Sequence, residues 1–129
     1  MPDTNTLKTI LIVEDEVSLN QTLTEVLTGE GYTTLSARNG KEGLDMALEH
    51  HPDLIVLDII MPVMDGMAML KELRKDDWGK TVSILLLTNV GDVEHMSEAL
   101  EQDALDYFVK SQMELDDVVA RVKQKLAEQ

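Results

Sequence analysis

The chain contains 129 residues, of which 43% are hydrophobic, and carries a formal net charge of −14 at pH 7. This charge argues against DNA or RNA as a direct partner, because phosphate contacts need clustered lysines and arginines, and no apolar run reaches the ~18–20 residues that cross a membrane. The sequence has no cysteine, which excludes disulfides and thiolate chemistry and fits a cytoplasmic protein.

The first part of the chain predicts a buried strand, a helix and an edge strand, after a loose polar lead-in over residues 1–7. The first strand is expected over residues 8–14, because residues 10–13 form an apolar run without polar alternation, which is typical of a strand buried on both faces. A helix follows and ends at the glycine-containing segment 29–31. Residues 33–37 are more polar, as expected of a strand at a sheet edge. The helix is expected to bury Leu19, Leu23, Val26 and Leu27.

The middle of the chain repeats this alternation. Asn39 and Glu42 resemble a capping box, which predicts the start of a second helix. Residues 54–57 are another buried apolar run, and Asp58 closes it. The second helix is expected to bury Leu44, Ala47 and Leu48. A third helix is marked by Leu70 and Leu73 and is expected to end near residues 78–79.

The last part predicts two more strands and two more helices. Residues 82–87 and 107–109 are apolar runs of strand length. Ser111 and Glu114 have the spacing of a capping box, which predicts the start of the last helix. The fourth helix is marked by Val93, Met96, Ala99 and Leu100, and the fifth by Leu115, Val118, Val119, Val122 and Leu126.

Five strands that alternate with five helices predict a doubly wound α/β fold with a parallel sheet and right-handed crossovers. We find no internal repeat, linker or low-complexity segment in the sequence. A single domain over residues 1–129 is therefore expected.

Polar residues follow the apolar runs at the ends of four predicted strands. Because the carboxyl ends of parallel strands share one edge of the sheet, these side chains are expected to meet there. Convergent carboxylates without histidine or cysteine suit an oxygen-binding cation such as Mg²⁺. A hydroxyl and an amine beside that cation suit a phosphoryl group. The residues are Glu14, Asp15, Asp58, Thr88 and Lys110.

Four segments together resemble the receiver domain of bacterial two-component response regulators, a CheY-like family. They cover residues 10–16, 57–66, 87–88 and 106–110, in the order that the family has. The resemblance implies a flavodoxin-like (βα)5 fold with strand order 2-1-3-4-5. It also implies a phosphorelay protein, monomeric or weakly dimeric, and we expect a stand-alone receiver.

The resemblance assigns a role to each residue at the strand ends. Asp58 would accept a phosphoryl group from a sensor histidine kinase or a phosphotransfer protein and later lose it to water. Asp15, Asp58 and the backbone carbonyl of Ile60 would bind Mg²⁺, with Glu14 nearby through water. Lys110 would pair with the phosphoryl oxygens, which fits the need to neutralise charge around an aspartate nucleophile.

The resemblance also implies a switch and an output surface. Thr88 would donate a hydrogen bond to the phosphoryl group, and Tyr107 would turn inward when Thr88 moves. A protein effector would then read the face formed by the fourth helix, fifth strand and fifth helix. An acidic stripe on this face is expected to meet a basic partner surface. Its residues are Asp92, Glu94, Glu98, Glu101 and Asp103.

The chain departs from the family pattern at two positions. Ser111 follows Lys110 where proline in a cis peptide is usual, and a cis bond before serine would cost ~2.5–4 kcal/mol. Ser111 is expected to cap the last helix with Glu114 instead. Asn89 follows Thr88 where a smaller residue is usual, and its side chain is expected to narrow the entrance to the site.

Three alternatives use the same sequence features. A receiver-like module could act through protein contacts alone, without phosphorylation; the complete set of acids, Thr88 and Lys110 argues against this. An aspartyl-phosphate hydrolase typically has a second acid two residues after its nucleophile, where this chain has Ile60. A flavin-binding relative would need a phosphate-cradling loop after the first strand, where this chain has acids that repel an anion.

Overall fold

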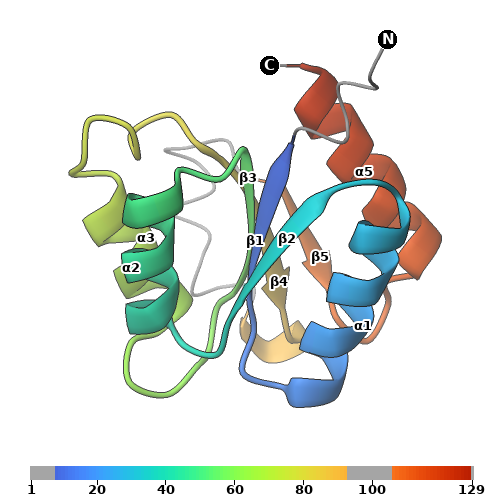
Figure 1. Ribbon diagram of the computed structural model, residues 1–129. Helices are drawn as coiled ribbons and strands as arrows, with labels where there is room; N and C mark the ends of the chain where they lie inside the picture. Colours follow the sequence, from blue (N-terminus) through green and yellow to red (C-terminus); the bar gives the residue numbers. More distant parts are fainter. Residues whose placement is uncertain (1–7, 93–105, 129) are drawn as a thin grey trace, which may run out of the picture.

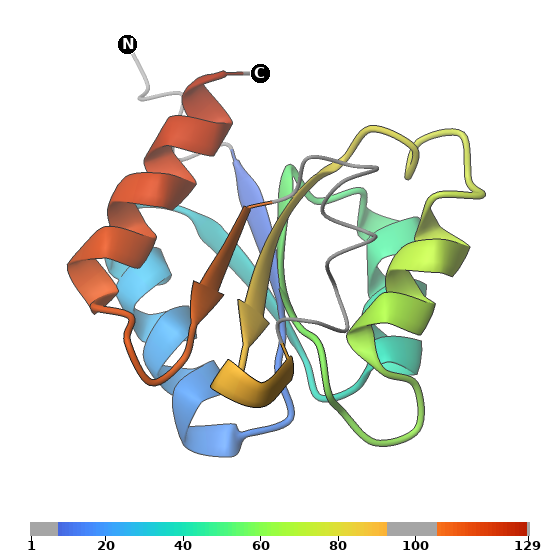
Figure 2. The same ribbon diagram turned by 180° about the vertical axis from the view of Figure 1, so that it is seen from behind.

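The computed structural model describes residues 8–92 and 106–128, which form a five-stranded parallel sheet with helices on both faces (Figure 1, Figure 2). The strand order β2-β1-β3-β4-β5 confirms the predicted doubly wound, flavodoxin-like fold. The elements are β1 (Thr9–Val13), α1 (Val17–Gly29), β2 (Thr33–Ala37), α2 (Gly40–His50), β3 (Leu54–Asp58), α3 (Gly66–Leu73), β4 (Ser83–Thr88), β5 (Asp106–Val109) and α5 (Leu115–Ala127). The predicted fourth helix and most of the acidic stripe lie outside the described residues.

The central strands are apolar throughout because helices cover both faces of the sheet. Helices α1 and α5 lie on one face, and α2 and α3 on the other (Figure 1). Side chains alternate between the two faces along each strand. In β1, Leu11 and Val13 pack in the core with α2 and α3, whereas Ile10 and Ile12 pack with α1 and α5. No helix in the described part of the chain is long and apolar enough to cross a membrane.

Helix α2 begins as predicted, but one of its three expected core residues is exposed. The Asn39 side chain accepts a hydrogen bond from Glu42 N at 2.9 Å, which confirms the cap. Leu48, expected in the core, is 38% exposed. Ala47 is buried as predicted, and Gly43 faces the sheet beside it, where a Cβ on Gly43 would lie 2.8 Å from a methyl carbon of Val13. This close approach turns Leu48 toward solvent.

Helices α3 and α5 differ from the prediction at one end each. Helix α3 ends at Leu73, before residues 78–79, because the Arg74 guanidinium binds the carbonyls of Gly79 and Val82 and holds the chain in turns. The capping box at Ser111 is wrong, since α5 begins at Leu115 with Glu114 itself at the N-cap. Ser111 lies in the preceding turn, outside the helix.

All five strands run in one direction, so their carboxyl ends share one edge of the sheet. The arrowheads of β4 and β5 mark this edge in Figure 2. The register pairs Val13 with Leu57, Asp58 with Leu87, and Thr88 with Val109. The sheet therefore places residues 14, 58, 88 and 110 at neighbouring strand ends.

Candidate functional site

Lys110 lies between two buried carboxylates. Its Nζ is 2.6 Å from Glu14 Oε1 and 3.0 Å from Asp58 Oδ2. Glu14 is fully buried, and Asp58 is nearly so. Asp58 is the last residue of β3 and shares its sheet face with Leu54 and Val56, which pack under α1 and α5. The Lys110 ammonium thus pairs with two acids in a place where water has little access.

The remaining oxygens of the two acids have no hydrogen-bond partner among the residues described. These oxygens are Glu14 Oε2 and Asp58 Oδ1. Exposed Asp15 lies beside them, and one carboxylate oxygen from each of the three residues lies within 4.8 Å of the others. Buried oxygens without a donor are costly, and a cation bound to them removes that cost. The all-oxygen donor set fits Mg²⁺.

The charges of the cluster depend on each other. Burial, followed by the neighbouring Asp58, raises the pKa of Glu14 to about 8, and Lys110 offsets only part of that rise. Burial also raises the pKa of Asp58 against the lowering effects of Glu14 and Lys110. Burial lowers the pKa of Lys110, but its contacts with Glu14 and Asp58 outweigh this and leave the pKa raised. When no cation is bound, burial therefore favours a proton on this pair of acids.

The loop after Asp58 is held tightly against β3. Gly66 N donates to the Ile59 carbonyl at 2.7 Å. A Cβ on Gly66 would lie 2.1 Å from the backbone oxygen of Asp58, so only glycine fits there. The Ile60 side chain is half exposed, at the same edge of the sheet as the acids. The start of α3 thus fixes the backbone that carries Asp58.

The tip of this loop is strained. Val63 has a φ of 69°, in the left-handed region that a β-branched residue rarely adopts. Its side chain is 81% exposed, so packing does not hold it there. The next residue is tied down, since the Met64 carbonyl accepts from Gly40 N at 2.8 Å at the start of α2.

The two residues assigned to the switch lie in different surroundings. Thr88 is fully buried at the end of β4, and its hydroxyl donates to the Asn89 carbonyl at 3.0 Å. Tyr107 in β5 is 40% exposed. Because side chains alternate along a strand, Thr88 lies on the same face of β4 as Ile84 and Leu86, which is the face covered by α2 and α3. Asp58 lies on the opposite face of the sheet.

The two departures from the family pattern have clear local structures. The peptide between Lys110 and Ser111 is trans. The turn is closed by backbone hydrogen bonds, from Lys110 N to the Thr88 carbonyl at 2.8 Å and from Gln112 N to the Val109 carbonyl at 2.9 Å. The Asn89 amide is directed to Asp92, with its Nδ2 3.4 Å from a carboxylate oxygen.

One residue of the site region was missed by the sequence interpretation. Asn20 lies on the buried side of α1, and its Nδ2 donates to the Glu14 carbonyl at 3.0 Å. The available signal was its spacing, because Asn20 precedes Leu23 by three residues and Leu27 by seven. A polar residue on that apolar side requires hydrogen-bond partners.

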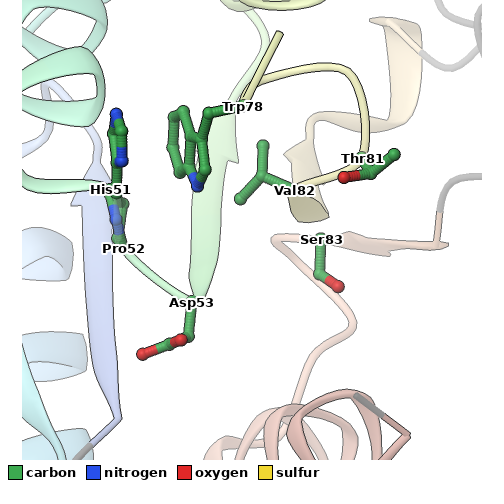
Figure 3. Close-up of a pocket in the computed structure, with 7 residues that line it drawn as sticks. All are labelled: His51, Pro52, Asp53, Trp78, Thr81, Val82 and Ser83. Carbon is green, nitrogen blue, oxygen red and sulfur yellow. The ribbon is translucent and has the colours of Figure 1, made fainter.

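A separate pocket of about 270 Å³ lies away from the acids (Figure 3). Its lining comes from the segments that enter β3 and β4, at the opposite edge of the sheet. The rings of His51 and Trp78 stack there with their centroids 4.4 Å apart. The pocket lining is His51, Pro52, Asp53, Trp78, Thr81, Val82 and Ser83.

Comparison with known protein families identifies one matching model, over residues 10–123, described as the response regulator receiver domain. Among curated proteins, the chain is 35% identical over 117 residues to sporulation initiation phosphotransferase F of Bacillus subtilis, covering 91% of this chain and 92% of that protein. It is 41% identical over 103 residues to the "Probable transcriptional regulator ycf27" of Cyanophora paradoxa, covering 80% of this chain. The chain spans only 42% of the length of that second relative.

Solved structures give the same fold. The receiver domain of Francisella response regulator 1452 superposes with a TM-score of 0.83 at 27% identity, covering 94% of this chain and 98% of that one. The chemotaxis response regulator CheY4 of Vibrio cholerae gives a TM-score of 0.81 at 26% identity, covering 92% and 98%.

Proposed function

Since the chain belongs to the response regulator receiver family, which serves phosphorylation-based two-component signalling, we propose that Asp58 is its phosphoryl acceptor. The observation that carries this proposal is the Asp58 carboxylate itself. One of its oxygens pairs with Lys110, and the other is buried without a hydrogen-bond donor among the described residues. The Asp58 carboxylate can therefore offer one oxygen to a cation and the other to the incoming phosphorus.

The transfer needs one bond to form and one to break. A carboxylate oxygen of Asp58 attacks the phosphorus of a phosphohistidine, carried in the cytoplasm by a sensor histidine kinase or a phosphotransfer protein. The new oxygen–phosphorus bond forms as the nitrogen–phosphorus bond breaks. The other ring nitrogen of the phosphohistidine carries a proton, so the imidazole leaves as a neutral group. Lys110 neutralises charge on the phosphoryl oxygens, and the Thr88 hydroxyl donates a hydrogen bond to them. Water later attacks the same phosphorus and regenerates Asp58.

We propose Mg²⁺ as the cofactor, held by Asp15, Asp58 and the carbonyl of Ile60. The burial of Glu14 and its contact with Lys110 support a role close to the cation, directly or through one water. A bound Mg²⁺ would supply positive charge that draws the incoming phosphoryl group toward Asp58 and lowers the repulsion between the two. The chain's own residues supply the nucleophile, the ammonium and the hydroxyl.

We propose that the phosphodonor docks on the apolar side chains around the acids. Four aliphatic residues follow the carboxyl ends of strands, and each is at least 45% exposed. Such exposure is unusual for aliphatic residues beside a charged site. Their removal should slow phosphoryl transfer from a protein donor more than transfer from a small one. These residues are Val17, Ile60, Val63 and Val90.

The output is proposed to follow from Thr88 and Tyr107. When the Thr88 hydroxyl leaves the Asn89 carbonyl for the phosphoryl group, space opens on its side of β4 and Tyr107 can turn from solvent toward it. The face that includes β5 and α5 then changes shape for a protein effector. This coupling through two side chains is a two-state device of the kind that phosphorylation can bias.

Intact mass after incubation with Mg²⁺ and acetyl phosphate tests the assignment. Wild type should gain the mass of one phosphoryl group, whereas Asp58→Asn should gain none. Asp45→Asn is the matched control, because Asp45 lies on the exposed side of α2 and pairs only with Lys41 among its described contacts. Full labelling of Asp58→Asn would falsify the proposal.

A further inference from the structure

Asn20 is a buried polar residue that the proposed chemistry does not use directly. It lies in α1 and is 3% exposed. A buried side-chain amide is costly unless its donors and acceptor are all satisfied. Its partners therefore indicate why the position is polar.

Both donors and the acceptor of the Asn20 amide have hydrogen-bond partners. Its Nδ2 donates to the carbonyls of Glu14 at 3.0 Å and Ala37 at 3.1 Å. Its Oδ1 accepts from Ser36 Oγ at 2.6 Å. The Thr24 hydroxyl donates to the Asn20 backbone carbonyl at 2.8 Å and lies 3.3 Å from Oδ1. One side chain thus ties α1 to the ends of β1 and β2.

The Glu14 carbonyl has a particular importance for the acid cluster. It belongs to the planar peptide unit that joins Glu14 to Asp15. The pairing of β1 with β2 ends just before it, at Val13 and Ala37, with a last hydrogen bond from Glu14 N to the Ala37 carbonyl at 3.0 Å. Beyond that point, the hydrogen bond from Asn20 Nδ2 to the Glu14 carbonyl holds the plane of the Glu14–Asp15 peptide.

We propose that Asn20 is a positioning residue that fixes the orientation of the Glu14–Asp15 peptide and thereby aims both carboxylates at one cation. This inference rests on the proposed function of the site. A rotation of that peptide would move the Asp15 side chain relative to Glu14 and Asp58, whose oxygens now lie within 4.8 Å of each other. Residues that orient metal ligands without touching the metal typically change its affinity 10- to 100-fold when replaced.

The test uses Asn20→Asp, which keeps the side-chain size but removes both N–H donors and places a carboxylate against two carbonyl oxygens. We expect the Mg²⁺ dissociation constant, measured by isothermal titration calorimetry, to rise about tenfold. The Mg²⁺ concentration that half-saturates labelling by acetyl phosphate should rise by the same factor. At saturating Mg²⁺ the labelling rate should return to the wild-type value, because the nucleophile and Lys110 are intact.

Leu126→Ala is the control for a loss of stability alone. Leu126 is buried at the far end of α5, away from the acids. Urea unfolding in EDTA should show both variants less stable than wild type, but only Asn20→Asp should have weaker Mg²⁺ binding. Equal Mg²⁺ affinity in Asn20→Asp and wild type overturns the positioning role.

A second variant keeps the test valid if Asn20→Asp does not unfold cooperatively. Ser36→Ala removes the donor to Asn20 Oδ1 without touching Glu14 and should weaken Mg²⁺ binding by a smaller factor; unchanged binding overturns the inference. The two proposals also fail differently. If wild type takes no phosphate at Asp58 but Asn20→Asp still weakens Mg²⁺ binding, the proposed function fails and the positioning role stands.

Discussion

Lys110 Nζ lies 2.6 Å from Glu14 Oε1, although 96 residues separate the two along the chain. The same ammonium also contacts Asp58, so two buried acids share one partly buried ammonium group. Two carboxylates beside one ammonium leave an excess negative charge that only a proton or a metal ion can balance. The stability of the protein, as well as its chemistry, is therefore expected to depend on what occupies the site.

Replacing Lys110 should destabilise the metal-free protein. Lys110→Met leaves Glu14 and Asp58 without their buried cation, and breaking such a pair costs about 3–5 kcal/mol. Urea unfolding at pH 8 in EDTA measures the loss, which should be smaller at pH 5, where Glu14 carries a proton. Lys41→Met is the control, because its pair with Asp45 is solvent-exposed and is worth less than about 1 kcal/mol. Similar losses in the two variants would contradict the buried pairing.

The metal-free protein should lose stability as pH rises. The pKa of Glu14 is raised from 4.5 to about 8 on folding, so its contribution is fully present below pH 4.5 and is lost as pH rises toward 8. The slope is at most about 1.4 kcal/mol per pH unit for one proton. Urea unfolding from pH 5 to 8.5 in EDTA should show the fall in wild type and a flatter profile in Glu14→Gln. A wild-type stability that increases over this range would refute the shared-proton interpretation.

Mg²⁺ should raise the melting temperature, and Asp15 should be required for this. A ligand that binds only the native state at 100 times its dissociation constant adds about 2.7 kcal/mol. Asp15 is exposed, so Asp15→Ala should change metal-free stability by no more than about 0.5 kcal/mol. The variant should nevertheless lose its response to Mg²⁺ in thermal unfolding. The neighbouring acid Glu16, also exposed and outside the cluster, gives the control Glu16→Ala, which should respond as wild type does.

Two glycine substitutions should have opposite effects. A Cβ on Gly66 would lie 2.1 Å from the Asp58 backbone oxygen, so Gly66→Ala must shift either α3 or β3. Gly29 has no other atom within 4 Å of its Cβ position at the end of α1, so Gly29→Ala should stabilise by about 0.5–1 kcal/mol. Chemical denaturation gives both values. If Gly66→Ala keeps the same free energy of unfolding as Gly29→Ala, the loop between β3 and α3 adjusts freely, which would contradict this prediction.

Relief of the strain at Val63 offers a further check on the loop. A left-handed φ at a β-branched residue costs about 1–3 kcal/mol, and glycine adopts it without that cost. Val63→Gly should therefore stabilise the protein by about 1 kcal/mol in urea unfolding, since an exposed side chain loses little packing. Val90→Gly, exposed but without a positive φ, should not stabilise it.

The sequence was most informative where local chemistry and topology agree. Continuous apolar runs predicted the buried strands, and a parallel sheet then required the residues after them to meet at one edge. This reasoning brought Asp58 and Lys110 together correctly. In the structure the ammonium of Lys110 pairs with Glu14 and Asp58, and its role toward a phosphoryl group stays a prediction.

Other features depend on tertiary geometry that spacing does not encode. The exposure of Leu48 follows from how closely Gly43 approaches the sheet. The end of α3 depends on the Arg74 side chain, which binds carbonyls further along the chain. The predicted capping box of Ser111 and Glu114 was wrong because the same four-residue pattern also occurs in a turn that precedes a helix. Asn20 is a polar residue on the buried side of α1, so a pattern of apolar residues alone does not include it.

The position of Trp78 determines how this protein can be observed in solution. Trp78 is the single tryptophan of the chain, and its ring stacks on His51 at the edge of the sheet opposite Asp58. Its fluorescence is therefore a native probe of the region between α2 and α3. We expect the emission to report unfolding while responding little to cation binding or phosphorylation, so a spectroscopic assay of the acid site requires a second chromophore placed at the other end of the strands.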